Sequence, residues 1–202
     1  MAKIEDFTIL TPLNSNAKRP NYKIFKNKKL SIFEKFFYVR DINFNNDIDQ
    51  NIISVCRLDG YSLILNMNKF KDQNFFDENF FLFRECTDLV VRVVKKGEKV
   101  YLIKDSLIDH KESKSSDRIY DDEIHFTRAW HWMWSKYYFN KKHLGTLNAS
   151  IKIIINILTT LIDLVKNYFQ KKKNNVKICR MRISGGLNAL QGKKAWYRPD
   201  IK

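Results

Sequence analysis

The sequence predicts a mixed α/β protein, in which a sheet with flanking helices is followed by a helical, basic and amphipathic tail. Short apolar runs bounded by turn residues recur through the first 110 residues, and apolar residues at helical spacing dominate after residue 116. The chain of 202 residues is 44% hydrophobic and 29% charged, which is typical of globular proteins. Its three Cys residues show no CxxC spacing, so neither a disulfide framework nor a zinc knuckle is expected.

The first part of the chain is expected to contain short strands and one helix. The strand candidates are the apolar runs 7–10, 22–25, 36–39, 52–56, 61–65, 100–103 and 107–108. The first run is expected to stop at Thr11-Pro12, and the polar stretches 13–21 and 40–51 are expected to be loops. A helix is predicted after the aromatic run 80–83, because Leu89, Val90, Val93 and Val94 fall at helical spacing before Lys95, Lys96 and Gly97.

The second part of the chain is expected to be largely helical. Residues 121–142 carry aromatic side chains at spacings of three and four, including Trp130 and Trp134. Trp132 lies between them, and three Trp within five helical residues cannot all face one core. At least one should therefore meet a partner helix, a sugar or a membrane interface, unless the helix is buried on two sides. Residues 146–170 combine a polar stripe with an apolar stripe on the opposite face.

The charge of the chain is concentrated near its C-terminal end. Residues 141–202 contain 14 Lys and Arg and two acidic residues, a net charge of +12, whereas residues 1–140 carry +3. Such a block implies a polyanionic partner, either an anionic membrane surface or a nucleic acid. The regular apolar stripe favours the membrane, and nucleic acid is the less expected partner because no RNP, KH or zinc motif is present.

Two further observations bear on localisation. The first six residues contain no apolar run, so no signal peptide is expected. The uncharged run 153–162 has only ten residues, whereas a membrane-spanning helix needs roughly 20. The sequence therefore predicts a cytoplasmic protein that lies peripherally at the inner face of the cell membrane.

Two clusters of polar residues are candidates for chemistry. Glu85 and Asp88 lie three residues apart at the start of the predicted helix, where one face would present both carboxylates to a hydroxyl. Acidic residues in a first turn also have a purely structural explanation, because they complement the helix dipole. His110 closes a predicted strand, where it could bind a metal or a phosphate or simply lie on the surface.

These residues belong to a series of motifs that resembles family 2 glycosyltransferases, in particular the rhamnosyltransferase-like and galactofuranosyltransferase-like members. The resemblance runs from about residue 7 to the end of the chain. In chain order the motifs are Asp59-Gly60-Tyr61-Ser62-Leu63-Ile64-Leu65, Phe76-Asp77-Glu78-Asn79-Phe80-Phe81-Leu82-Phe83, Glu85-x-x-Asp88-Leu89-x-x-Arg92, Lys96-Gly97, Ile108-x-His110, the stretch from Trp130-His131-Trp132 to Lys142-His143, and Gly192-Lys193-Lys194-x-Trp196-Tyr197-Arg198-Pro199.

The resemblance implies a GT-A fold and an inverting transfer of sugar from a nucleotide-sugar donor to a lipid-linked or polysaccharide acceptor of the cell envelope. Glu85 or Asp88 would deprotonate the acceptor hydroxyl, while a divalent cation, Mg²⁺ or Mn²⁺, stabilises the leaving nucleoside diphosphate. His110 would help to hold the metal-bound diphosphate. The other implied contacts with substrate are Asp59, Gly60, Arg84, Arg92, Trp130 and Trp132.

The sequence departs from the family pattern at two points. Cys86 occupies the position of the usual carboxylate base, and a thiol is a poor substitute for it. No DxD metal motif precedes residue 41, and Asp47-Ile48-Asp49 lies in an expected loop on the wrong side of the resemblance. We therefore expect an acceptor-side half of a GT-A-like domain at 1–116 and a membrane-associating tail at 117–202. The donor-binding half would be a separate N-terminal partner, would have been removed by a gene break, or would lie outside the recorded sequence. The alternative is a catalytically inactive, membrane-binding remnant or scaffold.

Overall fold

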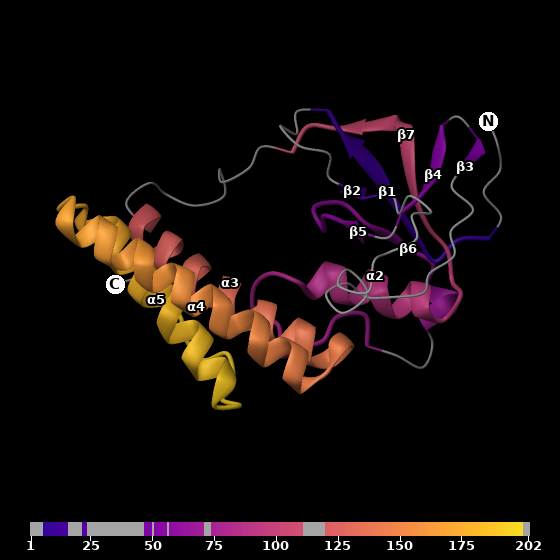
Figure 1. Ribbon diagram of the computed structural model, residues 1–202. Coiled ribbons are helices and arrows are strands. Elements are labelled where there is room, and N and C mark those ends of the chain that lie inside the picture. The colour runs from indigo at the N-terminus through magenta and orange to yellow at the C-terminus, as the bar shows by residue number, and fades with distance from the viewer. Residues whose placement is uncertain are drawn as a thin grey trace. The chain divides into compact units, whose positions relative to one another are not determined.

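The structure is a computed structural model that describes residues 6–15, 22–23, 47–49, 51–55, 57–70, 74–110 and 120–199 (Figure 1). These residues form two compact units. The first unit, called the sheet unit here, contains the described residues up to 77 together with 85–110. The second, called the helical unit, contains 78–84 and 120–199. The aromatic segment 78–84 therefore belongs with the helices, and the predicted boundary at 116 falls outside the described residues.

The sheet unit contains a five-stranded mixed sheet with the strand order β3-β4-β7-β1-β6. The central strands β1 and β7 are parallel, and all other neighbours in this sheet are antiparallel. A separate antiparallel pair is formed by β2 and β5. The strands are β1 (Ile9–Asn14), β2 (Tyr22–Lys23), β3 (Asp47–Asp49), β4 (Ile52–Ser54), β5 (Arg57–Leu58), β6 (Ile64–Leu65) and β7 (Val100–Ile108). The predicted mixed α/β class is confirmed at this level.

A register shift between β1 and β7 explains two wrong strand predictions. Pro12 pairs with Ile103 but Leu13 pairs with Leu107, so residues 104–106 form a bulge in β7. Because of this bulge, the two expected short strands are one strand, and β1 continues past Thr11-Pro12 to Asn14. The predicted loop 40–51 is also wrong at 47–49, which form the edge strand β3. The strand candidate 36–39 lies outside the described residues.

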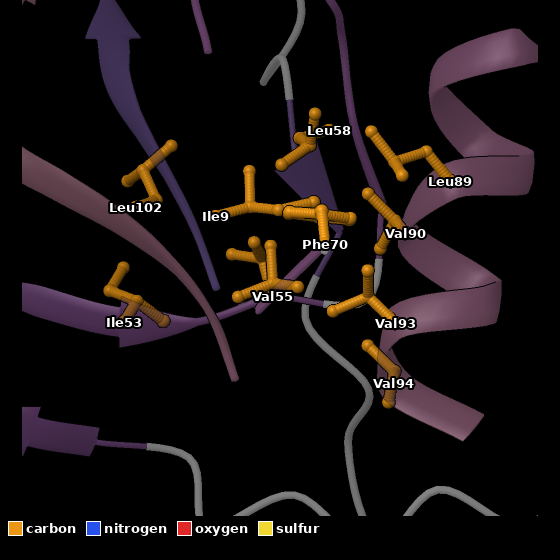
Figure 2. Close-up of a cluster of buried hydrophobic side chains, with 11 residues drawn as sticks. Ile9, Ile53, Val55, Leu58, Phe70, Leu89, Val90, Val93, Val94 and Leu102 are labelled. Carbon is orange, nitrogen blue, oxygen red and sulfur yellow. The ribbon is translucent and has the colours of Figure 1, made fainter. Parts of the chain in front are cut away.

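Helix α2 (Glu85–Lys95) confirms the predicted helix and covers the sheet with its valine-rich face. Figure 2 shows its apolar side chains directed at those of the strands and of the 3-10 helix Met67–Phe70. After the helix, Gly97 adopts a φ of 77° and its N–H donates to the carbonyl of Val94, which ends the helix as the sequence predicts. The buried core comprises Ile9, Ile53, Val55, Leu58, Phe70, Leu89, Val90, Val93, Val94, Val100 and Leu102.

The helical unit consists of α3 (Asp121–Leu144), α4 (Thr146–Phe169) and α5 (Lys173–Leu190), and each helix contacts the other two. The predicted helices at 121–142 and 146–170 are confirmed, and most of the basic segment 171–202 is helical as well. Its core comprises Trp130, Met133, Trp134, Tyr137, Ala149, Ile153, Ile157 and Ala189. Trp132 is 41% exposed whereas Trp130 and Trp134 are buried, so the three Trp do divide between core and surface.

Helix α4 half-buries part of its polar stripe and exposes most of its apolar residues, although Ile153 and Ile157 are buried in the core. The Lys152 ammonium donates to Asn140 Oδ1 of α3 over 3.2 Å, and the Lys136 ammonium of α3 donates to Asn156 Oδ1 of α4 over 2.8 Å. Burial, followed by the charge of Arg84, lowers the pKa of Lys136. Burial, followed by the charges of Lys136 and Arg84, lowers the pKa of Lys152. Ten large apolar side chains of α4 are exposed instead: Leu147, Ile151, Ile154, Ile155, Leu158, Leu161, Ile162, Val165, Tyr168 and Phe169.

This arrangement changes the sequence argument about membrane crossing. Among the described residues, α4 is the one helix whose length and composition would allow it to cross a membrane. The uncharged run 153–162 ends at Lys152 and Asp163, whereas a candidate span may include one or two charged residues, so the count underestimated the length of the apolar segment. Length and composition alone do not distinguish a helix that crosses a bilayer from one that lies along its surface.

The segment 192–199, called the C-terminal strap here, packs on α3. The indole N–H of Trp134 donates to the Lys193 carbonyl over 2.9 Å, and the Tyr197 ring stacks on Trp130 with the centroids 5.8 Å apart. His131 is fully buried and its Nε2 lies 2.8 Å from the Tyr197 carbonyl oxygen, so Nε2 carries the proton. Burial lowers the pKa of His131, which favours this neutral form. Ala195 and Tyr197 of the closing motif therefore pack against the core of the helical unit, whereas Trp196 is exposed.

Candidate functional site

The predicted site residues fall into two groups, one in each unit. The sheet unit contains six of them, Asp59, Gly60, Glu85, Asp88, Arg92 and His110. The helical unit contains the other three, Arg84, Trp130 and Trp132. Each group is described within its own unit below.

In the sheet unit, the turn at 59–62 is fixed at the carboxyl ends of the parallel strands β1 and β7. The Tyr61 hydroxyl donates to the Pro12 carbonyl over 3.1 Å, and the Thr11 hydroxyl donates to the Ser62 carbonyl over 3.0 Å. The Tyr61 ring stacks on His110, which follows β7, with the centroids 5.0 Å apart. Carboxyl ends of parallel strands are the usual place for ligands in α/β sheets. Tyr61 therefore connects the two predicted residues Gly60 and His110.

The same turn contacts the first residues of α2. A Cβ on Gly60 would overlap the Cys86 sulfur and lie 3.2 Å from the Cys86 Cβ, so this close approach requires glycine. The Cys86 thiol lies 3.6 Å from Glu85 Oε1 and donates to it. The other carboxylate oxygen, Glu85 Oε2, is buried and accepts no hydrogen bond from any residue that the structure describes. A buried carboxylate oxygen without a donor is rare, and a water, an ion or a ligand hydroxyl could complete its hydrogen bonding.

The environment of Cys86 keeps its thiol protonated. Burial, together with the negative charges of Glu85 and Asp59, raises the pKa of Cys86 from 9.0 to about 12. A thiol with this pKa cannot act as a base near neutral pH. In this site Cys86 is a hydrogen-bond donor to Glu85.

We expect Cys86 to react about 10³-fold more slowly with iodoacetamide at pH 8 in the folded chain than in urea, because alkylation requires the thiolate. Peptide mass spectrometry resolves this rate from those of the other cysteines. The unfolded chain releases the proton near pH 9 and the folded chain only near pH 12, so this thiol also lowers stability as the pH rises through that window. Equal alkylation rates in both states would contradict the assigned environment.

Asp88 and Arg92 form a separate, buried ion pair on α2. Asp88 is fully buried, and its Oδ2 lies 2.8 Å from Arg92 Nε. The Arg92 guanidinium also donates to the carbonyls of Asn74 and Phe75, which fixes the chain that precedes the aromatic segment. These contacts give both residues a structural role, and the i,i+4 spacing in the sequence is typical of such a pair.

The sheet unit offers His110 but no set of metal ligands around it. Among the described residues, no three His, Cys, Asp or Glu side chains gather at one place where they could hold a metal ion. The His110 ring stacks on Tyr61, and its backbone N–H lies 3.5 Å from Asn14 Oδ1. The residues that the structure describes therefore do not fit a complete site for Mg²⁺ or Mn²⁺.

In the helical unit, Arg84 and Trp132 form a partly exposed pair. The Arg84 guanidinium lies 5.4 Å from the Trp132 ring centroid and 5.6 Å from that of Phe139, within the range of cation–π attraction. Arg84 and Phe83 both adopt a positive φ, of 71° and 65°, which is uncommon outside glycine. Trp130 is fully buried, and its indole N–H lies 3.2 Å from the Ser184 hydroxyl oxygen, so packing explains Trp130. Trp132 and Arg84 are the members of this group that a sugar or lipid headgroup could contact.

Two features of these sites were given no role in the sequence-based predictions. Tyr61, which connects the turn to His110, was quoted within a motif but given no role. Lys136 and Lys152 were missed as a half-buried pair with hydrogen bonds between α3 and α4, although each lies four residues before an asparagine, at the spacing of facing side chains on a helix. No family model, no curated protein and no solved structure matches the chain.

Proposed function

We propose that this chain takes part in sugar transfer from a nucleotide-sugar donor to a hydroxyl of a lipid-linked or polysaccharide acceptor, as its motifs suggest. The observation that carries the proposal is the buried Glu85 Oε2, which accepts no hydrogen bond from the described residues. It lies at the start of α2, beside the turn that contains Asp59 and Gly60. A carboxylate in this setting is suited to accept the proton of a bound hydroxyl.

In this proposal Glu85 is the general base. The acceptor hydroxyl donates to Glu85 Oε2, and the proton moves to this carboxylate while the hydroxyl oxygen attacks the sugar carbon that carries the leaving diphosphate. The Cys86 thiol holds Oε1 and so orients the carboxylate. The Asp88–Arg92 pair holds the helix turn that presents Glu85. No step is derived through a metal ion, because the described residues do not form its site.

The proposed place of reaction is the inner face of the cell membrane, where the protein is peripheral. The exposed apolar side chains of α4 and the net charge of +12 over residues 141–202 support this location. An amphipathic helix with basic flanks binds a bilayer by burying apolar surface and by attracting anionic headgroups. The same location would bring the protein to a lipid-linked acceptor.

A transfer assay tests the proposal. The full chain is incubated with radiolabelled UDP-, TDP- or GDP-sugars, with Mg²⁺ or Mn²⁺, and with a lipid or polysaccharide extract of the cell envelope. We expect incorporation of label into the extract that depends on the protein. If incorporation fails with every donor and the chain also fails to bind nucleoside diphosphates in calorimetry, the proposal is contradicted for this chain.

One observation favours a second candidate function, a membrane-binding remnant or scaffold without transfer activity. Cys86 occupies the position that the resemblance reserves for a carboxylate base, and its raised pKa keeps it from replacing that base. Under this alternative the chain binds membranes but gives neither transfer nor saturable, metal-dependent binding of nucleoside diphosphates. The assay and the calorimetric titration together therefore separate the two functions.

A further inference from the structure

We infer that the turn between α4 and α5 is a binding site for the phosphate headgroups of anionic membrane lipids, with the exposed face of α4 lying in the plane of the bilayer surface. The inference deepens the peripheral location proposed above and rests on it. It names the residues that recognise the lipid and the orientation of the helical unit at the membrane. Its ligand is an anionic phospholipid within a bilayer.

The first observation is a basic hollow at this turn. It has a volume of about 620 Å³ and is lined by Tyr168, Phe169, Lys171, Lys173, Val176, Lys177 and Arg180. The lining combines four cations with two aromatic rings and contains no acidic residue. Aromatic and basic side chains together are typical of the headgroup layer, where rings reach the acyl boundary and cations reach the phosphates.

The second observation is the charge state of this lining. Lys177 is paired with Glu123 of α3 over 3.1 Å and lies over the Phe126 ring, so its charge is partly balanced. Lys171, Lys173 and Arg180 form no ion pair with any acidic residue that the structure describes. Residues 164–199 contain ten Lys and Arg and no Asp or Glu, so the counter-ion at the hollow comes from α3, where Glu123 pairs with Lys177. The hollow is thus complementary to phosphate.

The third observation is continuity between the hollow and the apolar face of α4. Tyr168 and Phe169 line the hollow and are 67% and 78% exposed, and they are also the last two members of the exposed apolar stripe of α4. Leu158 and Ile162 lie further along the same stripe, 55% and 69% exposed. A single ligand that is apolar on one side and anionic on the other fits both surfaces, and a phospholipid bilayer has this character.

The fold of the unit favours a helix in the plane of the membrane over a helix that crosses it. The face of α4 opposite the apolar stripe packs on α3 and α5, and it carries the Lys152 and Asn156 contacts with α3. Crossing would carry the charged surfaces of α3 and α5 into the hydrocarbon as well, which is costly. In the plane, the apolar stripe alone enters the acyl boundary and the partner helices stay in water.

Vesicle flotation with the full chain tests the inference. We compare vesicles of neutral phosphatidylcholine with vesicles that contain 30% phosphatidylglycerol, a composition within the anionic range of bacterial membranes. The triple variant Lys171→Gln, Lys173→Gln, Arg180→Gln should bind the anionic vesicles about 100-fold more weakly than the wild type, because each basic residue near the surface contributes roughly fivefold to the affinity. The matched control Lys95→Gln, Lys96→Gln, Lys104→Gln removes the same charge from the sheet unit and should bind as the wild type does.

The apolar stripe is tested by Leu158→Gln with Ile162→Gln. Both side chains are exposed, so thermal melting should not change, while binding to anionic vesicles should be lost. The inference is overturned if the triple variant and its control bind equally, or if neutral and anionic vesicles bind equally. A nucleic-acid site would overturn the inference as well: the triple variant would then lose salt-dependent retention of DNA but keep vesicle binding. A dimer interface would also overturn it: the apolar variant would then abolish a dimer seen in sedimentation but keep vesicle binding. None of these outcomes depends on sugar transfer, so a failure here is distinct from a failure of the proposed activity.

Discussion

Replacement of Gly185 by alanine should destabilise the helical unit by about 3 kcal/mol or more, at the upper end of overpacking effects. A Cβ at this position would overlap the carbonyl oxygen of Trp130 and lie 3.0 Å from the carbonyl carbon. Backbone atoms of a packed helix cannot move aside as a flexible side chain can, so α5 would have to separate from α3. Circular dichroism should show a melting temperature lower by more than about 10 °C.

The neighbouring glycine provides the matched control. A Cβ on Gly186 would lie 3.1 Å from the Cγ1 and Cδ1 atoms of Ile157, which belong to a side chain that can adjust. Alanine also favours the helix over glycine by about 1 kcal/mol, which offsets this contact. Gly186→Ala should therefore change the stability by no more than about 1 kcal/mol. Equal melting of the two variants would show that the close approach of α5 to Trp130 does not hold in solution.

The second large effect concerns Glu85. In the transfer assay, Glu85→Gln should lower the rate by about 10² to 10⁴-fold, because the amide keeps the shape of the side chain but cannot accept the acceptor proton. The KM for the acceptor should change much less. Thermal melting should be retained, because the Glu85 carboxylate has no ion pair among the described residues to lose. The exposed Glu78→Gln is the control of equal charge change and should transfer at the wild-type rate.

Asp88→Asn separates the roles of the two predicted acids. Asp88 is fully buried against Arg92, and removal of one partner from a buried ion pair costs about 3–5 kcal/mol. We therefore expect Asp88→Asn to lower the melting temperature of the sheet unit, whereas Glu85→Gln lowers the transfer rate. The opposite result would assign the base to Asp88 instead. In that case Asp88→Asn would melt normally but fail to transfer sugar, whereas Glu85→Gln would remain active.

The sequence was most informative where one periodicity governs an element. Helix α2 was predicted because four apolar residues at helical spacing are followed by Gly97, and all of these signals are local. The strands were harder, since the bulge at 104–106 breaks the apolar pattern of β7 without ending the strand. Strand β3 has the composition of a loop and is fixed by its pairing with β4, which no local pattern reveals.

The packing of α4 shows a second limit of sequence reasoning, because Ile153 and Ile157 are buried while most of the other apolar residues of the helix are exposed. The polar and apolar stripes were both predicted, but a helical pattern does not state which stripe meets a partner helix. Burial of Lys152 beside α3 depends on Asn140, an acceptor that lies twelve residues earlier in the chain. At the candidate site, the spacing of Glu85 and Asp88 was visible in the sequence. The different environments of the two acids, with a buried Glu85 Oε2 and an Asp88 paired with Arg92, were visible only in the structure.

The position of the C-terminal strap has a consequence for synthesis on the ribosome. Trp130 and His131 of α3 are covered by Tyr197, and Trp134 is anchored to Lys193, so the helical unit closes only after these residues leave the exit tunnel. At about 5–20 residues per second, the ribosome needs several seconds to translate from the end of α3 to Arg198. During this interval the aromatic face of α3 is uncovered. A nascent chain stalled within α5 should therefore bind holdase chaperones, and a chain released past residue 199 should not.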